Sequence, residues 1–132
     1  MYPDNTKACM TRYNVLDEFR ITSTEKDDDD DGSGKMIQVV VPIDEKPRAD
    51  VRFGYKGPSG KFINNPPTYN PSEEVEKEVF EKGAKAFERA RLYRLAVDRL
   101  QEAGVPDERI PGVLDLIEEE SDIHQVVQLA SS

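Results

Sequence analysis

The sequence has almost none of the residues that build metal centres and nucleophilic active sites. It contains one cysteine, Cys9, and one histidine, His124, in 132 residues. A single cysteine excludes an internal disulfide and a cysteine-rich zinc or iron–sulfur site, and a single histidine excludes a site built on a histidine pair. No serine or cysteine neighbours His124 in a recognisable nucleophile motif. We therefore expect a protein that is not an enzyme and that uses no metal or cofactor.

Long apolar runs are also missing. Even the run from Val39 to Ile43 is far shorter than the roughly 20 residues that a membrane helix needs. The first residues lack the basic start followed by an apolar stretch that is typical of a secretory signal. We therefore expect a cytoplasmic protein without a membrane partner.

Large apolar residues are scarce and charge is distributed unevenly. Val, Ile, Leu and Phe make up 31 of the 132 residues, just above the level of about 20% below which a highly charged chain is usually disordered. The net charge of −9 divides into −4 over residues 1–35, +2 over 36–71 and −7 over 72–132. We expect a mobile acidic tail over 1–35, a β-hairpin and proline-rich loop over 36–70, and a helical domain over 71–132.

The expected tail contains one apolar patch, which includes Val15, Leu16 and Phe19. The patch precedes five consecutive aspartates, Asp27 to Asp31, in a linker that also contains Gly and Ser. Such a segment is typical of an arm that orders only when it binds a partner. The equally weighted alternative is that it packs back on its own domain. The aspartate run begins like a calcium loop but has Gln38 where a bidentate carboxylate is required, so we expect a solvated acidic linker.

The middle of the chain predicts two short strands. Residues 36–43 place β-branched side chains on one side at a spacing of two, and residues 51–56 alternate in the same way. The segment is basic and contains four interleaved aromatic residues, a composition that can bind single-stranded nucleic acid. Because the whole chain is acidic, we expect poor affinity for nucleic acid and prefer a protein surface as the partner. The aromatic residues are Phe53, Tyr55, Phe62 and Tyr69.

A long helix is predicted from about Pro71 to Ala103. Asn70 can cap its start, Pro71 suits its first position, and Gly104 supplies its end. Apolar residues at steps of three and four predict one buried stripe, in which Gly83 would lie close to another backbone segment or to a second copy of the chain. Two shorter helices are expected, from near Pro111 and near Ser121, as a helical hairpin. The stripe comprises Val79, Phe80, Gly83, Ala86, Phe87, Ala90, Val97 and Leu100.

Part of this pattern resembles the internal scaffolding proteins of small single-stranded DNA phages, the microviruses. The resemblance rests on the segment Asn65-Pro66-Pro67-Thr68-Tyr69-Asn70 and on the spaced phenylalanines and alanines that follow it, Phe80, Ala86, Phe87 and Ala90. It covers about 30 residues, whereas the aspartate run, the hairpin and the region after Pro106 depart from the family. It implies a non-enzymatic helper that binds coat protein inside an assembling shell.

These observations together predict a mainly α protein with a small β-hairpin, one long helix, a C-terminal helical hairpin and a disordered acidic N-terminal tail. The predicted function is that of a non-enzymatic protein-interaction factor, such as a phage assembly scaffold that binds coat protein. The alternative is an acidic inhibitor that mimics nucleic acid and occupies the binding cleft of a host enzyme. A homo-oligomer is left open. The expected partner-binding residues are Val15, Leu16, Phe19, Phe53, Tyr55, Tyr69, Gly83 and Phe87.

Overall fold

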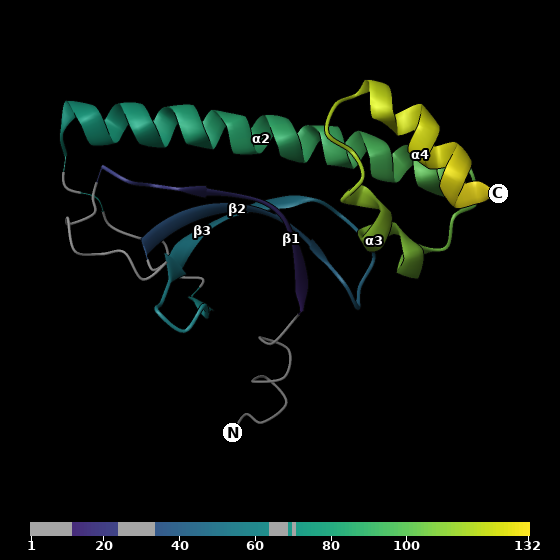
Figure 1. Cartoon of the computed structure of the whole chain (residues 1–132), viewed down its shortest axis with the longest axis horizontal. Helices are drawn as coiled ribbons and strands as arrows, with labels where there is room; N and C mark the ends of the chain where they lie inside the picture. Colours follow the sequence, from purple (N-terminus) through teal and green to yellow (C-terminus); the bar gives the residue numbers. More distant parts are fainter. Residues whose placement is uncertain (1–11, 24–33, 64–68, 70) are drawn as a thin grey trace. The chain divides into compact units, whose positions relative to one another are not determined.

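The computed structural model describes residues 12–23, 34–63, 69 and 71–132 (Figure 1). Within them, four strands form one sheet in the order β1-β2-β3-β4. The strands are β1 (Tyr13–Arg20), β2 (Gly34–Pro42), β3 (Asp50–Lys56) and β4 (Phe62–Ile63); the helices are α2 (Glu73–Glu102), the 3-10 helix η1 (Asp107–Arg109), α3 (Ile110–Leu114) and α4 (Ser121–Ser131).

The prediction of a mainly α protein with a small hairpin is therefore wrong. Of the described residues 47% are helical and 25% lie in strands, and the expected hairpin forms the β2 and β3 part of a four-stranded antiparallel sheet. The mobile-tail prediction is also wrong where it can be compared, because Tyr13–Arg20 is a strand of that sheet. The aspartate run lies outside the described residues. The two short C-terminal helices are found where they were expected, as the five-residue α3 and as α4.

Strand β1 contains a β-bulge. Ile21 N–H donates to the Lys35 carbonyl at 2.9 Å, and Ile43 N–H donates to the Arg12 carbonyl at 3.0 Å. Between these two bonds, residues 12–21 of one strand lie opposite residues 35–43 of the other. The first stretch is one residue longer than the second, and such an extra residue defines a β-bulge. The alternation of exposed and half-buried residues along β1 breaks at Leu16 and Asp17, where two half-buried residues follow one another. The bulge therefore reverses which residues of β1 face outward.

Contacts divide the chain into two compact units. Of the described residues, the first unit contains 12–16, Val40–Asp50 and Arg91–Ser132, and the second contains 17–23, 34–39, 51–63, 69 and 71–90. The core of the first unit is built mainly from buried side chains of the C-terminal part of α2 and of the helices that follow it, among them Tyr93, Leu100, Ile110, Leu114, Ile117, Ile123 and Val126.

The long helix is confirmed, and its two ends have clear physical causes. Ser72 caps its start, because its hydroxyl accepts a hydrogen bond from the Val75 N–H at 3.1 Å; the predicted cap, Asn70, lies outside the described residues. At the other end Gly104 has a positive φ of 85°, its N–H donates to Gln101, and the Val105 N–H donates to Leu100. This pair of bonds is a Schellman motif, which ends the helix where the glycine predicted.

Candidate interaction surface on helix α2

Two phenylalanines of α2 lie on its exposed side and not in the buried stripe. The side chains of Phe80 and Phe87 are 77% and 48% exposed, whereas Ala86 and Ala90 are buried. The expected stripe was too wide, since it included two residues at the exposed edge of the buried side. The buried side of the helix in the second unit follows Val75, Ala86 and Ala90.

Phe80 and Phe87 share one helix face. Residues seven apart on an α-helix differ in direction by only about 20°. Ala84 lies between them at a spacing of four and is also exposed, so no large side chain on this face separates the two rings. Single exposed apolar residues are common, but two neighbouring large rings on one outward face are a feature that needs an explanation.

The exposed charges in the part of α2 that carries the two rings are mostly negative. In the part of α2 that belongs to the second unit, the exposed charged residues are five glutamates and two lysines: Glu73, Glu74, Glu76, Lys77, Glu81, Lys85 and Glu88. This part of the helix is therefore acidic overall, whereas the exposed charges within one turn of the rings are balanced: Glu76, Glu81 and Glu88 against Lys77, Lys85 and Arg91. A basic surface with apolar side chains would complement the two rings and the net charge of this part of the helix.

Glu78 attaches this helix to the end of β1. Its carboxylate accepts hydrogen bonds from the Thr22 N–H at 2.9 Å, the Thr22 hydroxyl at 2.8 Å and the Ser23 N–H at 2.7 Å, and it pairs with Lys82 at 2.6 Å. Burial acts to raise the pKa of Glu78, but the hydrogen bonds from Lys82 and from the backbone of Thr22 and Ser23 outweigh it and hold the pKa well below its usual range. Lys82 also donates to the Arg20 carbonyl. The helix is thus held on the strand by charge-assisted bonds on the side away from the two rings.

A second ion pair holds the same helix to β1. The Arg89 guanidinium lies 3.1 Å from the Asp17 carboxylate, and both side chains are about three-quarters buried. Asp17 faces the helix because the bulge shifts the alternation of β1 by one residue. The outward face of α2 is therefore presented on a helix that is attached at both Glu78 and Arg89.

Tyr69 lies near Glu78 and beneath a cation. The Lys35 ammonium is 4.8 Å from the centre of the Tyr69 ring. Burial raises the pKa of the Tyr69 hydroxyl, and the negative charge of Glu78 raises it further. The hydroxyls of Tyr69 and Ser23 are buried and have no hydrogen-bond partner among the described residues. Tyr69 is thus part of the packing between helix and sheet and not of the exposed face.

Two basic residues of the predicted hairpin, Arg52 and Lys56, belong to a network within the second unit. Arg52 donates from Nε to the Gln38 side-chain oxygen at 2.8 Å, and Gln38, which is 2% exposed, donates to Glu18. The Arg52 guanidinium also lies 4.0 Å from the centre of the Phe62 ring, and Lys56 pairs with Glu18 at 3.4 Å. Arg52 and Lys56 therefore have partners within the chain, which reduces the positive charge that the segment offers to other molecules.

The expected partner-binding residues do not form one surface. Val15 is 44% exposed and Leu16 half-buried in the first unit, while the other six lie in the second. Tyr55 and Phe87 are exposed there. Phe19, Phe53 and Tyr69 are half-buried, and Gly83 is buried. A Cβ at Gly83 would meet no described atom within 4 Å, so the expected close approach of another backbone is not found. Phe80 was the residue missed, although its spacing of seven from Phe87 was a signal for it.

The described part of the chain contains neither a metal-binding cluster nor a helix that could span a membrane. Residues 12–23, 34–63, 69 and 71–132 contain no group of three His, Cys, Asp or Glu side chains placed to hold a metal ion. None of the helices described is long and apolar enough to span a membrane.

Comparison of this chain with known proteins found no matching family model, no matching curated protein and no matching solved structure.

Proposed function

We propose that this chain is a non-enzymatic, cytoplasmic protein-interaction factor that docks a partner on the outward face of α2. The observation that carries the proposal is the exposure of Phe80 and Phe87 on one face of a helix that is attached to the sheet by Glu78 and Arg89. Covering an apolar side chain contributes roughly 1.5–3 kcal/mol, so two such rings are sufficient anchors for a protein interface.

The occupant that we propose is a basic, amphipathic segment of another protein. Its apolar residues would cover the two phenylalanines, and its lysines and arginines would face the surrounding glutamates. A second copy of the chain suits the face less well, since this part of the helix is acidic overall and would repel its own copy. The resemblance to microvirus scaffolding proteins, which includes Phe80 and Phe87, makes coat protein inside an assembling shell our specific candidate for this partner.

The test is a comparison of two double variants. Immobilised wild type, Phe80→Ser/Phe87→Ser and the matched control Leu116→Ser/Leu129→Ser are incubated with lysate of the source cells. The control removes two exposed apolar side chains of similar exposure, 59% and 62%, from the first unit. We expect a basic protein that wild type and control retain and that the phenylalanine variant loses. Equal retention of every bound protein by all three forms would contradict the proposal.

One observation favours the alternative of an acidic mimic of nucleic acid. After Gly104 the first unit exposes six acidic residues: Asp107, Glu108, Asp115, Glu118, Glu119 and Glu120. Arg109 is the one basic residue in that part of the sequence. A target of such a mimic would bind through charge, so its affinity would fall steeply as salt is added. If the docking proposal is correct, binding of the captured partner depends on Phe80 and Phe87 instead.

A further inference from the structure

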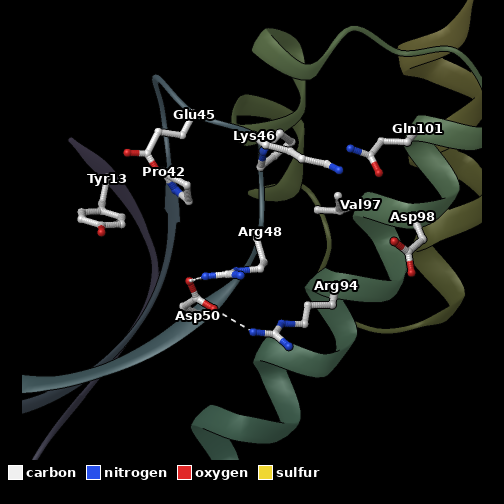
Figure 2. A pocket seen from close by; sticks show the side chains of 11 residues that line it. Tyr13, Pro42, Glu45, Lys46, Arg48, Asp50, Arg94, Val97, Asp98 and Gln101 are labelled. Atoms are coloured by element: carbon white, nitrogen blue, oxygen red, sulfur yellow. Dashed lines mark hydrogen bonds and ion pairs between the residues drawn. The ribbon is translucent and has the colours of Figure 1, made fainter. Parts of the chain in front are cut away.

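The first unit contains an open pocket that the docking surface does not use. It has a volume of about 650 Å³, within the range that holds small ligands. Its walls come from the start of β1, the loop between β2 and β3, and one side of α2 (Figure 2). The residues that carry its chemistry are Lys46, Arg48, Asp50, Arg94, Asp98 and Gln101.

Two guanidinium groups in this pocket are held in place by one carboxylate. Asp50 accepts a hydrogen bond from Arg94 at 2.7 Å through one oxygen, and Arg48 lies 3.3 Å from the other. Arg94 also donates from Nε to the Ala49 carbonyl at 2.7 Å. A guanidinium has five N–H donors, so both arginines keep further donors for a ligand. Their side chains are 70% and 54% exposed, a degree at which such ion pairs contribute little to stability.

A third cation extends into the same hollow. In Figure 2 the Lys46 side chain extends toward Gln101 of α2, whereas the carboxylate of Glu45 is turned toward Tyr13. Lys46 forms no hydrogen bond or ion pair with another described residue. The same is true of Asp98, which lies on α2. Three cationic groups thus line one pocket, two of them beside Asp50 and the third nearer Gln101, together with the carboxylates of Asp50 and Asp98. Asp98 and Gln101 add acceptors for hydroxyl groups.

We infer that this pocket binds the oxyanion group, phosphate or carboxylate, of a small hydroxylated molecule. The forked donors of Arg48 and Arg94 suit either oxyanion, and Lys46 adds a point charge. The hydroxyl groups of the ligand would donate to Asp98 and Gln101. This site shares no residue with the docking proposal and is tested with different variants, so either proposal can fail without the other.

The experiment is a calorimetric titration with three compounds that share one carbon skeleton: glucose 6-phosphate, gluconate and glucose. The full-length protein is used as wild type, as Lys46→Gln, as Arg48→Gln and as Lys85→Gln. The last removes one exposed positive charge from α2 in the other unit and is the matched control. Circular dichroism of each variant confirms that it is folded.

We expect glucose 6-phosphate or gluconate, or both, to bind wild type saturably, and glucose not to bind. The stronger of the two anions identifies the oxyanion. Lys46→Gln and Arg48→Gln should each weaken binding by about tenfold, the effect of one lost charge-assisted hydrogen bond, and Lys85→Gln should leave it unchanged. Absence of binding by both anions, equal binding of glucose, or an equal loss in Lys85→Gln would overturn the inference.

Discussion

Gly54 lies directly beneath the aromatic ring of Phe62. A Cβ at position 54 would overlap the ring and would also meet the backbone carbonyl of Ile63. The carbonyl belongs to β4, whose Ile63 pairs with Tyr55 in the antiparallel register, so it cannot move without disturbing the sheet. The ring in turn lies against the Arg52 guanidinium. The absence of a side chain at position 54 is therefore what allows β4 to close over β3.

We predict that Gly54→Ala destabilises the protein by about 1–3 kcal/mol, the usual effect of overpacking. Urea unfolding measures the change. Gly57→Ala is the control, because the nearest described atom to a Cβ there is 3.9 Å away. Truncation of the ring should restore part of the loss, so Phe62→Ala should be less harmful in the Gly54→Ala background than in wild type. Strictly additive effects would show that the ring is not the obstacle.

Replacement of Gly83 by alanine should stabilise the protein, in contrast to the replacement of Gly54. It lies inside α2, and a Cβ there would meet no described atom within 4 Å. Glycine inside a helix costs roughly 0.5–1 kcal/mol relative to alanine, so Gly83→Ala should raise the free energy of unfolding by about that amount. A loss of stability would indicate that another segment approaches the helix at this position after all. Urea unfolding of Gly83→Ala and wild type measures the difference in the free energy of unfolding.

The acid limb of the stability curve should depend on Glu78. Its pKa is lowered in the folded state, so the unfolded chain takes up a proton here first as the pH falls. The stabilisation by Glu78 is therefore fully present above its ordinary value of 4.5 and is lost progressively below it. We predict that Glu78→Gln lowers stability at neutral pH and makes the stability less dependent on pH below that value. Glu81→Gln, which changes an exposed glutamate of the same helix, should leave the dependence unaltered; an equal effect of both would contradict this account.

Neutralisation of the three consecutive glutamates Glu118, Glu119 and Glu120 should not affect partner binding. We predict that Glu118→Gln/Glu119→Gln/Glu120→Gln leaves both the affinity for the captured partner and its salt dependence unchanged, since these residues are not part of the proposed docking face. Titrations at two salt concentrations measure both quantities. A salt dependence that disappears in this variant would favour the nucleic-acid mimic.

Local patterns were sufficient to predict most of the elements. The helix from about Pro71 to Ala103 is observed as Glu73–Glu102, and residues 36–43 and 51–56 lie almost entirely in β2 and β3. These signals are local: a glycine with positive φ at the helix end, and alternation of β-branched residues. Strand β1 was missed because its bulge interrupts the alternation and because its partner, β2, follows a long acidic segment.

The candidate sites were harder to predict than the elements. Phe80 and Phe87 fall at spacings that fit either edge of a helical stripe, and only the packing of Val75, Ala86 and Ala90 decides which side is buried. The pocket depends on pairing between Asp50 and Arg94, which are 44 residues apart. Such long-range contacts leave no periodic signal in the sequence.

The most direct test of the account is the affinity of the purified partner for three forms of the chain. Titration calorimetry would compare wild type, Phe80→Ala/Phe87→Ala and the control Leu116→Ala/Leu129→Ala. If the outward face of α2 is the docking surface, loss of both rings should weaken binding at least a hundredfold, as expected when anchors worth about 2 kcal/mol each are removed, and the control should match wild type. Equal affinities for wild type and the phenylalanine variant would show that the partner binds elsewhere.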